Sequence, residues 1–148
     1  MKKIILAIIV MFNIGCSMNR PMIDCFDPNN SSSDTSYYVS NKSYQGFIFP
    51  AKYQPMISIN EQRFTPNKDQ IERVELILAQ GPEDSDLKYK RQYLGSLNTS
   101  LDSLITIRLL RRGFREECFD KIVAFGFGEY YEKNQRIKVV NLKTKEIE

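Results

Sequence analysis

The sequence predicts an α+β domain in which one helix packs on a curved antiparallel sheet of four to five strands. A helical apolar pattern with capping residues lies between residues 65 and 81. Four segments with strand-like alternation follow it at hairpin spacing. The chain of 148 residues is long enough for one hydrophobic core. A helix on one face of such a sheet buries the apolar sides of both elements.

The predicted helix has recognisable start and stop residues. Thr65 is a good N-cap, and Pro66 suits the first helical position, where its missing N–H would have no partner in any case. Gly81 ends the helix, and Pro82 prevents its continuation. The apolar face comprises Ile71, Val74, Ile77 and Leu78.

Strands are predicted on both sides of this helix. Two short ones precede it, at 47–49 and 56–59. Residues 98–102 are expected to form a hairpin loop within an antiparallel meander. The four strands after the helix are predicted at 89–97, 104–111, 121–129 and 136–142. The order β-α-β-β-β-β is similar to the cystatin-like arrangement, and this likeness of element order implies no function.

The first sixteen residues have the layout of an export signal. Lys2 and Lys3 form a charged start, residues 4–12 form an apolar core, and small Gly15 precedes Cys16. This core is too short to cross a bilayer as a helix, which takes about 20 residues. A cleaved signal is therefore expected instead of a permanent transmembrane anchor.

A cysteine at position 16 resembles the lipobox of bacterial lipoproteins, although Asn13 stands where that family prefers leucine. The resemblance implies cleavage before Cys16, acylation of that residue and attachment to a membrane through the lipid. Ser17 implies the outer membrane if the cell has two membranes. An ordinary secretory signal with a coincidental cysteine is the alternative. Residues 64–72 and 89–95 also look like parts of small uncharacterised bacterial lipoproteins, which implies no activity.

Three parts of the chain are expected. Residues 1–15 are the cleaved signal peptide, 16–43 the lipidated N-terminus with a flexible polar tether, and 44–148 a single α+β domain. The chain has 21 basic and 18 acidic residues, so loss of Lys2 and Lys3 with the signal lowers its net charge from +3 to +1. This balance, in an exported protein, argues against a nucleic-acid partner.

Cysteine usage points to one disulfide bond. With Cys16 lipidated, Cys25 and Cys118 remain as an even pair in an oxidising compartment. A bond between them would fasten the mature N-terminus to the far end of the domain. Closing this loop of about 93 residues would add about 4 kcal/mol of stability in the chain-entropy model. The alternative is two buried or free thiols.

Histidine is absent from the chain. This absence removes the Ser-His-Asp triad, the Cys-His pair and imidazole metal ligands. We therefore expect no enzyme, no metal site and no cofactor. The acidic loop of Glu83, Asp84 and Asp86 lacks EF-hand spacing, so a plain polar loop is expected there.

Three local patterns each have a structural and a functional interpretation. Phe125-Gly126-Phe127-Gly128 indicates close approach of the helix or a sheet bend, or else a shallow ligand floor. A basic cluster indicates a solvated, mixed-charge hairpin end, or else a site for lipid head groups or anionic glycans. Tyrosines indicate docking of the tether on the domain, or else stacking on a partner. The cluster comprises Arg108, Arg111, Arg112, Arg115 and Lys121 among Glu116, Glu117 and Asp120, and the tyrosines are Tyr37, Tyr38, Tyr44 and Tyr53.

The expected function is binding without catalysis. The sequence predicts a lipid-anchored domain facing the periplasm or the cell exterior, with an envelope protein or glycan as its partner. An inhibitor or immunity-type protein is one concrete form. The alternatives are a small carboxylate-based hydrolase acting on envelope glycan and a structural envelope component. No ligand-binding residue is singled out by the sequence.

Overall fold

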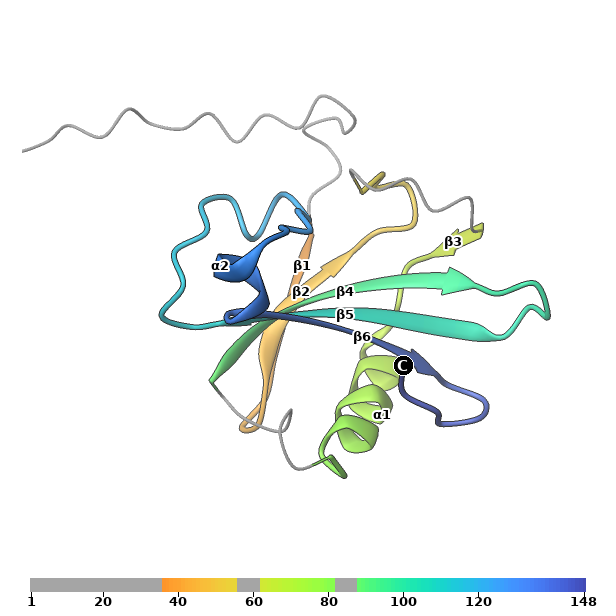
Figure 1. Cartoon of the computed structure of the whole chain (residues 1–148). Coiled ribbons are helices and arrows are strands. Elements are labelled where there is room, and N and C mark those ends of the chain that lie inside the picture. Colours follow the sequence, from red (N-terminus) through yellow and green to blue (C-terminus); the bar gives the residue numbers. More distant parts are fainter. Residues whose placement is uncertain (1–35, 56–61, 82–87) are drawn as a thin grey trace, which may run out of the picture.

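The computed structural model describes residues 36–55, 62–81 and 88–148. Six strands form one open sheet with α1 on one of its faces, and the chain between β5 and β6, which includes α2, lies over the other (Figure 1). The elements are β1 (Tyr37–Ser40), β2 (Gln45–Phe49), β3 (Gln62–Phe64), α1 (Lys68–Leu78), β4 (Tyr89–Leu97), β5 (Ser103–Arg111), α2 (Glu129–Glu132) and β6 (Gln135–Asn141).

The strand order is β1-β2-β4-β5-β6, with β3 also paired to β4. β2 runs parallel to residues 91–94 of β4, and β3 runs antiparallel to residues 95–97 of the same strand. The other neighbouring pairs are antiparallel. Because parallel strands need a crossover connection, the chain passes from β2 to β4 by way of α1 and so places this helix against the sheet.

The predicted helix is confirmed, but its predicted N-cap is wrong. Asn67 caps α1: its side chain accepts the Gln70 N–H at 2.9 Å, and the Gln70 side chain accepts the Asn67 N–H at 2.9 Å. This reciprocal pair is a capping box, which satisfies two N–H groups that Thr65 cannot reach from its position. Thr65 instead accepts a backbone N–H from the chain after β2. The helix ends at Leu78, shortly before Gly81.

Four predicted strands are confirmed. β4 has its predicted bounds, and β2, β5 and β6 differ from theirs by one or two residues. The predicted hairpin loop joins β4 to β5. The Asn98 side chain accepts the N–H groups of Ser100 at 2.9 Å and Asp102 at 2.8 Å, which is the way asparagine stabilises a turn.

The predicted strand at 121–129 is wrong, because this segment is irregular and pairs with no strand. Val123 is fully buried against Phe49, Tyr53 and Leu94 on the sheet face opposite α1. The alternating pattern therefore belongs to a segment that covers the sheet. We call residues 112–128 the covering segment.

The arrangement of the sheet also differs from the prediction. β1 comes from residues expected to belong to the tether, so the sheet begins before residue 44. Among the described residues, three strands precede α1 and three follow it, and one pair is parallel. The cystatin-like order and the fully antiparallel sheet of four to five strands are therefore not found, whereas the α+β class is. The predicted strand at 56–59 lies outside the described residues.

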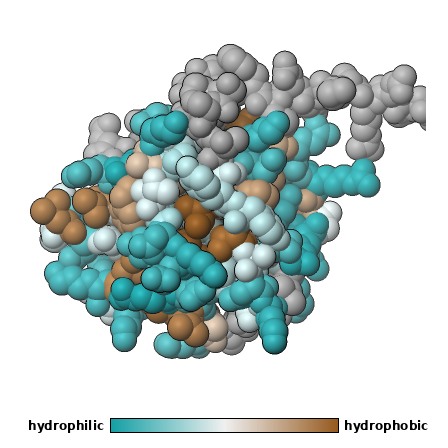
Figure 2. Space-filling view, turned by 180° about the vertical axis from the view of Figure 1, so that it is seen from behind, coloured by the Kyte–Doolittle hydropathy of each residue, from teal (hydrophilic) through white to brown (hydrophobic). Residues whose placement is uncertain are grey.

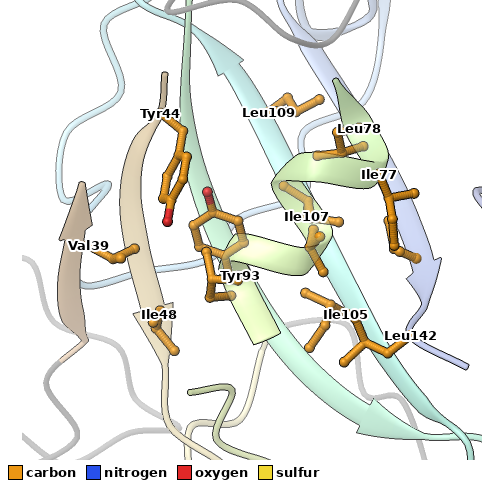
Figure 3. Close-up of a cluster of buried hydrophobic side chains, with 13 residues drawn as sticks. Val39, Tyr44, Ile48, Ile77, Leu78, Tyr93, Ile105, Ile107, Leu109 and Leu142 are labelled. Carbon is orange, nitrogen blue, oxygen red and sulfur yellow. The ribbon is translucent and has the colours of Figure 1, made fainter. Parts of the chain in front are cut away.

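Each face of the sheet has its own core. Under α1, Ile77 and Leu78 belong to the same buried cluster as Tyr93, Ile105 and Ile107 (Figure 3). On the opposite face, side chains of the covering segment pack on β2, β4 and β5 in two smaller clusters. Their buried members are Phe49, Tyr53, Leu94 and Val123 in one, and Leu110, Phe114 and Phe119 in the other.

Candidate binding site

A groove lies between the start of β4, the covering segment and α2, on the sheet face opposite α1. Its volume is about 610 Å³. Three cations, two carboxylates and two aromatic rings line it, and we call it the basic–aromatic groove. These residues are Lys90, Arg112, Phe114, Arg115, Glu116, Glu117 and Tyr131.

Arg108 does not belong to a solvated turn, and the prediction that placed it there is wrong. Its side chain is fully buried in β5. Its Nη1 and Nη2 donate to the two carboxylate oxygens of Glu116 at 2.7 and 2.6 Å. Nη1 also donates to Gln92 at 2.9 Å, and Nε donates to Gln135 at 2.6 Å. This network fastens the covering segment to the sheet and neutralises Glu116.

The remaining charges give the groove a positive balance. Glu116 is paired with Arg108, so among the described lining residues Glu117 is the one carboxylate left to oppose Lys90, Arg112 and Arg115. The Lys90 ammonium lies 4.2 Å from the centroid of the Phe119 ring. Burial lowers the pKa of Lys90, Glu116 offsets part of this effect, and Arg108 adds to it. Arginine forks beside this lysine suit carboxylate or phosphate groups.

Aromatic side chains continue from the groove onto the surface around α2. The ring centroid of Phe114 lies 4.6 Å from that of Tyr130 and 5.4 Å from that of Tyr131. Tyr130 is 65% exposed and Phe127 is 82% exposed. Arginine and aromatic residues are the types enriched at the energetic centres of binding interfaces.

The glycine pattern at 125–128 reflects a close approach, as its structural interpretation expects, but by a different neighbour. A Cβ added at Gly126 would lie 2.2 Å from the Tyr131 ring, so α2, and not α1, requires this glycine. Gly128 has a φ of 91°, a conformation that favours glycine, and it is the residue before α2.

The four tyrosines separate into two groups. Tyr44 and Tyr53 are buried in the domain, whereas Tyr37 and Tyr38 on β1 are 59% and 60% exposed. The Tyr53 hydroxyl accepts the Val123 N–H at 2.7 Å and so holds the covering segment. Tyr44 and Tyr53 are therefore core residues of the domain itself, and the exposed pair on β1 stays available for contact.

Of the predicted cysteine sites, Cys118 lies within the described residues. Cys16 and Cys25 lie outside the described residues, as does the acidic loop. Cys118 is half-buried in the covering segment, with a φ of 62°. The Ser36 hydroxyl donates to the Asp120 carbonyl, so the start of β1 lies beside the turn that carries Cys118. The Cys25–Cys118 bond stays a prediction.

A second buried ion pair lies on the α1 face. Glu75 of α1 forms an ion pair with Arg91, whose Nε lies 2.9 Å from Glu75 Oε1, and accepts a hydrogen bond from the Tyr93 hydroxyl at 2.8 Å. Burial raises the pKa of Glu75, and Arg91 and Tyr93 only partly oppose this effect. This cluster was not predicted from the sequence. Its signal was Arg91, a charged residue between two tyrosines on one face of a predicted strand, because such a residue needs a buried partner.

Two negative findings apply to the described ranges 36–55, 62–81 and 88–148. No group of three or more cysteine, aspartate or glutamate residues is placed to hold a metal ion there. No helix in these ranges is long and apolar enough to cross a membrane.

Figure 2 shows a face on which hydrophilic side chains dominate and apolar ones form separate patches. The candidate site is therefore identified by the charged and aromatic residues that line the groove.

Comparison of the chain with protein-family models, with curated proteins and with solved structures gives no significant match. Any function assigned to it therefore rests on its own residues and their geometry.

Proposed function

We propose that the chain is the precursor of a lipid-anchored envelope lipoprotein, and that its domain is a non-catalytic binding module for an anionic protein or glycan. The basic–aromatic groove is the observation that carries the binding function. Its positive balance and its rings match an anionic partner with some apolar surface. The anchor is supported by the apolar core that ends at Cys16, by resemblance to the lipobox, with the outer membrane as its place in a cell with two membranes.

The state of the groove carboxylates supports binding over hydrolysis. Both oxygens of Glu116 accept hydrogen bonds from Arg108, which occupies the atoms that a general acid or a nucleophile needs. Glu117 is the other carboxylate among the described lining residues, and it is exposed. Glycoside hydrolysis uses a pair of carboxyl groups that both act on the substrate.

Charge reversal at the groove tests the binding function. A double variant, Arg112→Glu with Arg115→Glu, should lose the partner that crosslinking recovers with the tagged wild-type protein from intact cells. The matched control is Arg111→Glu with Lys121→Glu, which makes the same charge change at exposed residues outside the groove lining. Recovery should also fall at high salt, because salt screens charges. Equal recovery by both double variants, or no specific recovery at all, would contradict the proposal.

The hydrolase alternative has its own signature. Turnover of peptidoglycan or envelope polysaccharide by the wild-type protein, abolished in Glu117→Gln, would replace the binding function with hydrolysis.

The anchor is tested separately, since Cys16→Ala should abolish labelling with palmitate and release the protein from membranes. Cys25→Ala should keep both properties, and the reverse pattern would move the lipid to Cys25.

A further inference from the structure

A second cavity lies on the opposite side of the sheet from the basic–aromatic groove. It is bounded by the turn between β1 and β2 and by the C-terminal half of α1, and its volume is about 340 Å³. This volume is at the small end of the range of ligand pockets, about 300–1,000 Å³. We call it the α1 pocket. Its walls include Asn41, Ser43, Tyr44, Glu72, Glu75 and Leu76.

Tyr44 lines the α1 pocket and carries a buried, unsatisfied hydroxyl. Its side chain is only 1% exposed, and among the described residues its hydroxyl has no hydrogen-bond partner. A buried hydroxyl without a partner costs about 1–3 kcal/mol, so such groups in native proteins call for an explanation. Figure 3 shows the Tyr44 ring beside that of Tyr93, whose hydroxyl donates to Glu75, with the two hydroxyls pointing in opposite directions. A ligand that hydrogen-bonds to Tyr44 would supply the missing partner.

Glu75 offers a carboxylate oxygen at the same place. The ion pair with Arg91 and the hydrogen bond from Tyr93 both involve its Oε1, and Oε2 takes part in no hydrogen bond among the described residues. Glu72 adds a second carboxylate one turn earlier on α1. It is half-exposed, and the Nζ of the exposed Lys68 lies 3.8 Å from its Oε1. Such a surface pair is weak and easily displaced.

The described walls of the α1 pocket contain no basic residue. Arg91 lies behind Glu75 and is fully buried, so it is already engaged with Oε1. Leu76, which is 68% exposed, forms an apolar part of the wall. The pocket therefore combines carboxylate oxygens and a phenol at depth with an apolar side, which matches a charged nitrogen on an alkyl chain.

We propose that the α1 pocket binds an alkyl ammonium or guanidinium group, supplied by a lysine or arginine side chain or by a free alkylamine. The charged nitrogen donates to Glu75 Oε2 and to the Tyr44 hydroxyl, Glu72 contributes attraction at the mouth, and the alkyl chain lies along Leu76. This site is independent of the basic–aromatic groove, because the two lie on opposite faces of the sheet and have opposite charge.

Calorimetric titration of the full-length chain in detergent micelles tests this proposal with two probes. Cadaverine represents a free alkylamine, and N-acetyl-lysine methylamide represents a lysine side chain on a peptide. We expect at least one of them to bind. Binding of the lysine derivative points to a protein source, and binding of cadaverine alone points to a free amine. N-acetyl-norleucine methylamide has a similar chain without the charge and should not bind.

Variants then locate the site. Glu72→Gln and Tyr44→Phe should each weaken binding about three- to tenfold, and Glu75→Gln about tenfold or more, because hydrogen bonds to charged groups are the stronger ones. Glu117→Gln removes the same charge in the basic–aromatic groove and should change nothing. Glu75→Gln also removes the charged partner of the buried Arg91 and so endangers folding. The exposed Glu72→Gln and the conservative Tyr44→Phe therefore keep the test decisive.

Three results would overturn the proposal. They are no binding of either charged probe at millimolar concentration, equal binding of the uncharged norleucine derivative, or unchanged binding in both Glu72→Gln and Tyr44→Phe. Failure here is distinguishable from failure of the proposed function, because the groove variant with Arg112→Glu and Arg115→Glu should bind these probes like the wild type.

Discussion

Arg91 and Arg108 lie on adjacent strands but on opposite faces of the sheet, and both are fully buried. Each is paired with a glutamate from the element that covers its face, Glu75 of α1 or Glu116 of the covering segment. Burying a charge is costly unless it is paired and hydrogen-bonded. Each pair therefore fixes one covering element at one position on the sheet.

Removing Glu116 should destabilise the domain strongly. Glu116→Ala leaves Arg108 buried without its charged partner, and loss of one member of a buried pair costs about 3–5 kcal/mol. Glu117→Ala, at the exposed neighbouring position, should change the free energy of unfolding by no more than about 0.5 kcal/mol. Urea denaturation measures both. Similar midpoints for the two variants would show that Arg108 finds enough support elsewhere.

Glu75 should make stability depend on pH. Its pKa in the folded protein is raised by burial above the ordinary value of 4.5, so between these two pKa values the folded state holds more protons than the unfolded state. Rising pH in this window therefore favours unfolding, and the contribution of Glu75 to the free energy of unfolding falls as pH rises above about 4.5. Glu75→Gln should lack this slope. Urea denaturation of both proteins between about pH 4 and 7 checks it, and parallel curves would contradict the raised pKa.

The covering segment is the element whose structure departs most from expectation. Its apolar residues alternate as in a strand, yet Val123 is buried, Phe125 is half-buried and Phe127 is 82% exposed. The alternation arises because some apolar side chains of the segment lie over the sheet face while others turn outward. Periodicity over so few residues cannot separate this arrangement from strand pairing.

Substitution of its glycines should separate close packing from simple flexibility. Gly126→Ala places a methyl group against the Tyr131 ring, so the ring must move and the domain should lose about 1–3 kcal/mol. Gly113→Ala meets nothing within 4 Å and should be neutral or slightly stabilising. Thermal denaturation and the near-ultraviolet signal of the tyrosines report both effects. Equal melting temperatures would show that Tyr131 does not occupy this space.

The sequence allowed prediction of the elements whose signals are long and local. α1, β4 and β5 have sustained periodicity, and Asn98 marks the hairpin between the two strands. β1 has only four residues, with one of them buried, and gives no alternation to detect. The parallel pairing of β2 with β4 depends on the path of the crossover, which no local pattern encodes.

The candidate site was less predictable than the strands. Arg112 and Arg115 belong to the cluster that the sequence singled out, but Lys90 and Tyr131 come from distant parts of the chain. Their meeting depends on the covering segment folding back over β4. The role of Arg108 was missed because basic residues near a turn are usually solvated, whereas its strand position faces a buried glutamate.

At the scale of the whole molecule, the described chain begins beside the covering segment, through the bond between Ser36 and Asp120. Cys25 precedes Ser36 by eleven residues, and Cys118 precedes Asp120 by two. An extended chain of eleven residues is much longer than the distance that two residues span. The predicted Cys25–Cys118 bond is therefore compatible with the path of the chain.

Intact mass of the membrane-extracted protein should match residues 16–148 plus acyl chains. Alkylation should add mass only after reduction, because acylation and the bond between Cys25 and Cys118 leave no free thiol. Cys118→Ser should allow one alkylation without reduction, which serves as the control. An unacylated product, or retention of residues 1–15, would contradict the lipobox interpretation, and alkylation of the unreduced wild type would contradict the bond.

The position of β1 has a mechanical consequence. β1 is an edge strand held to β2 by four residue pairs, and its first residue follows the segment that leads to the proposed anchor. Tension between membrane and domain would enter at Ser36 and peel β1 from its open end, one pair after another. A bond from Cys25 to Cys118 would instead pass the load into the covering segment, past β1. The disulfide would then protect this edge strand from mechanical load.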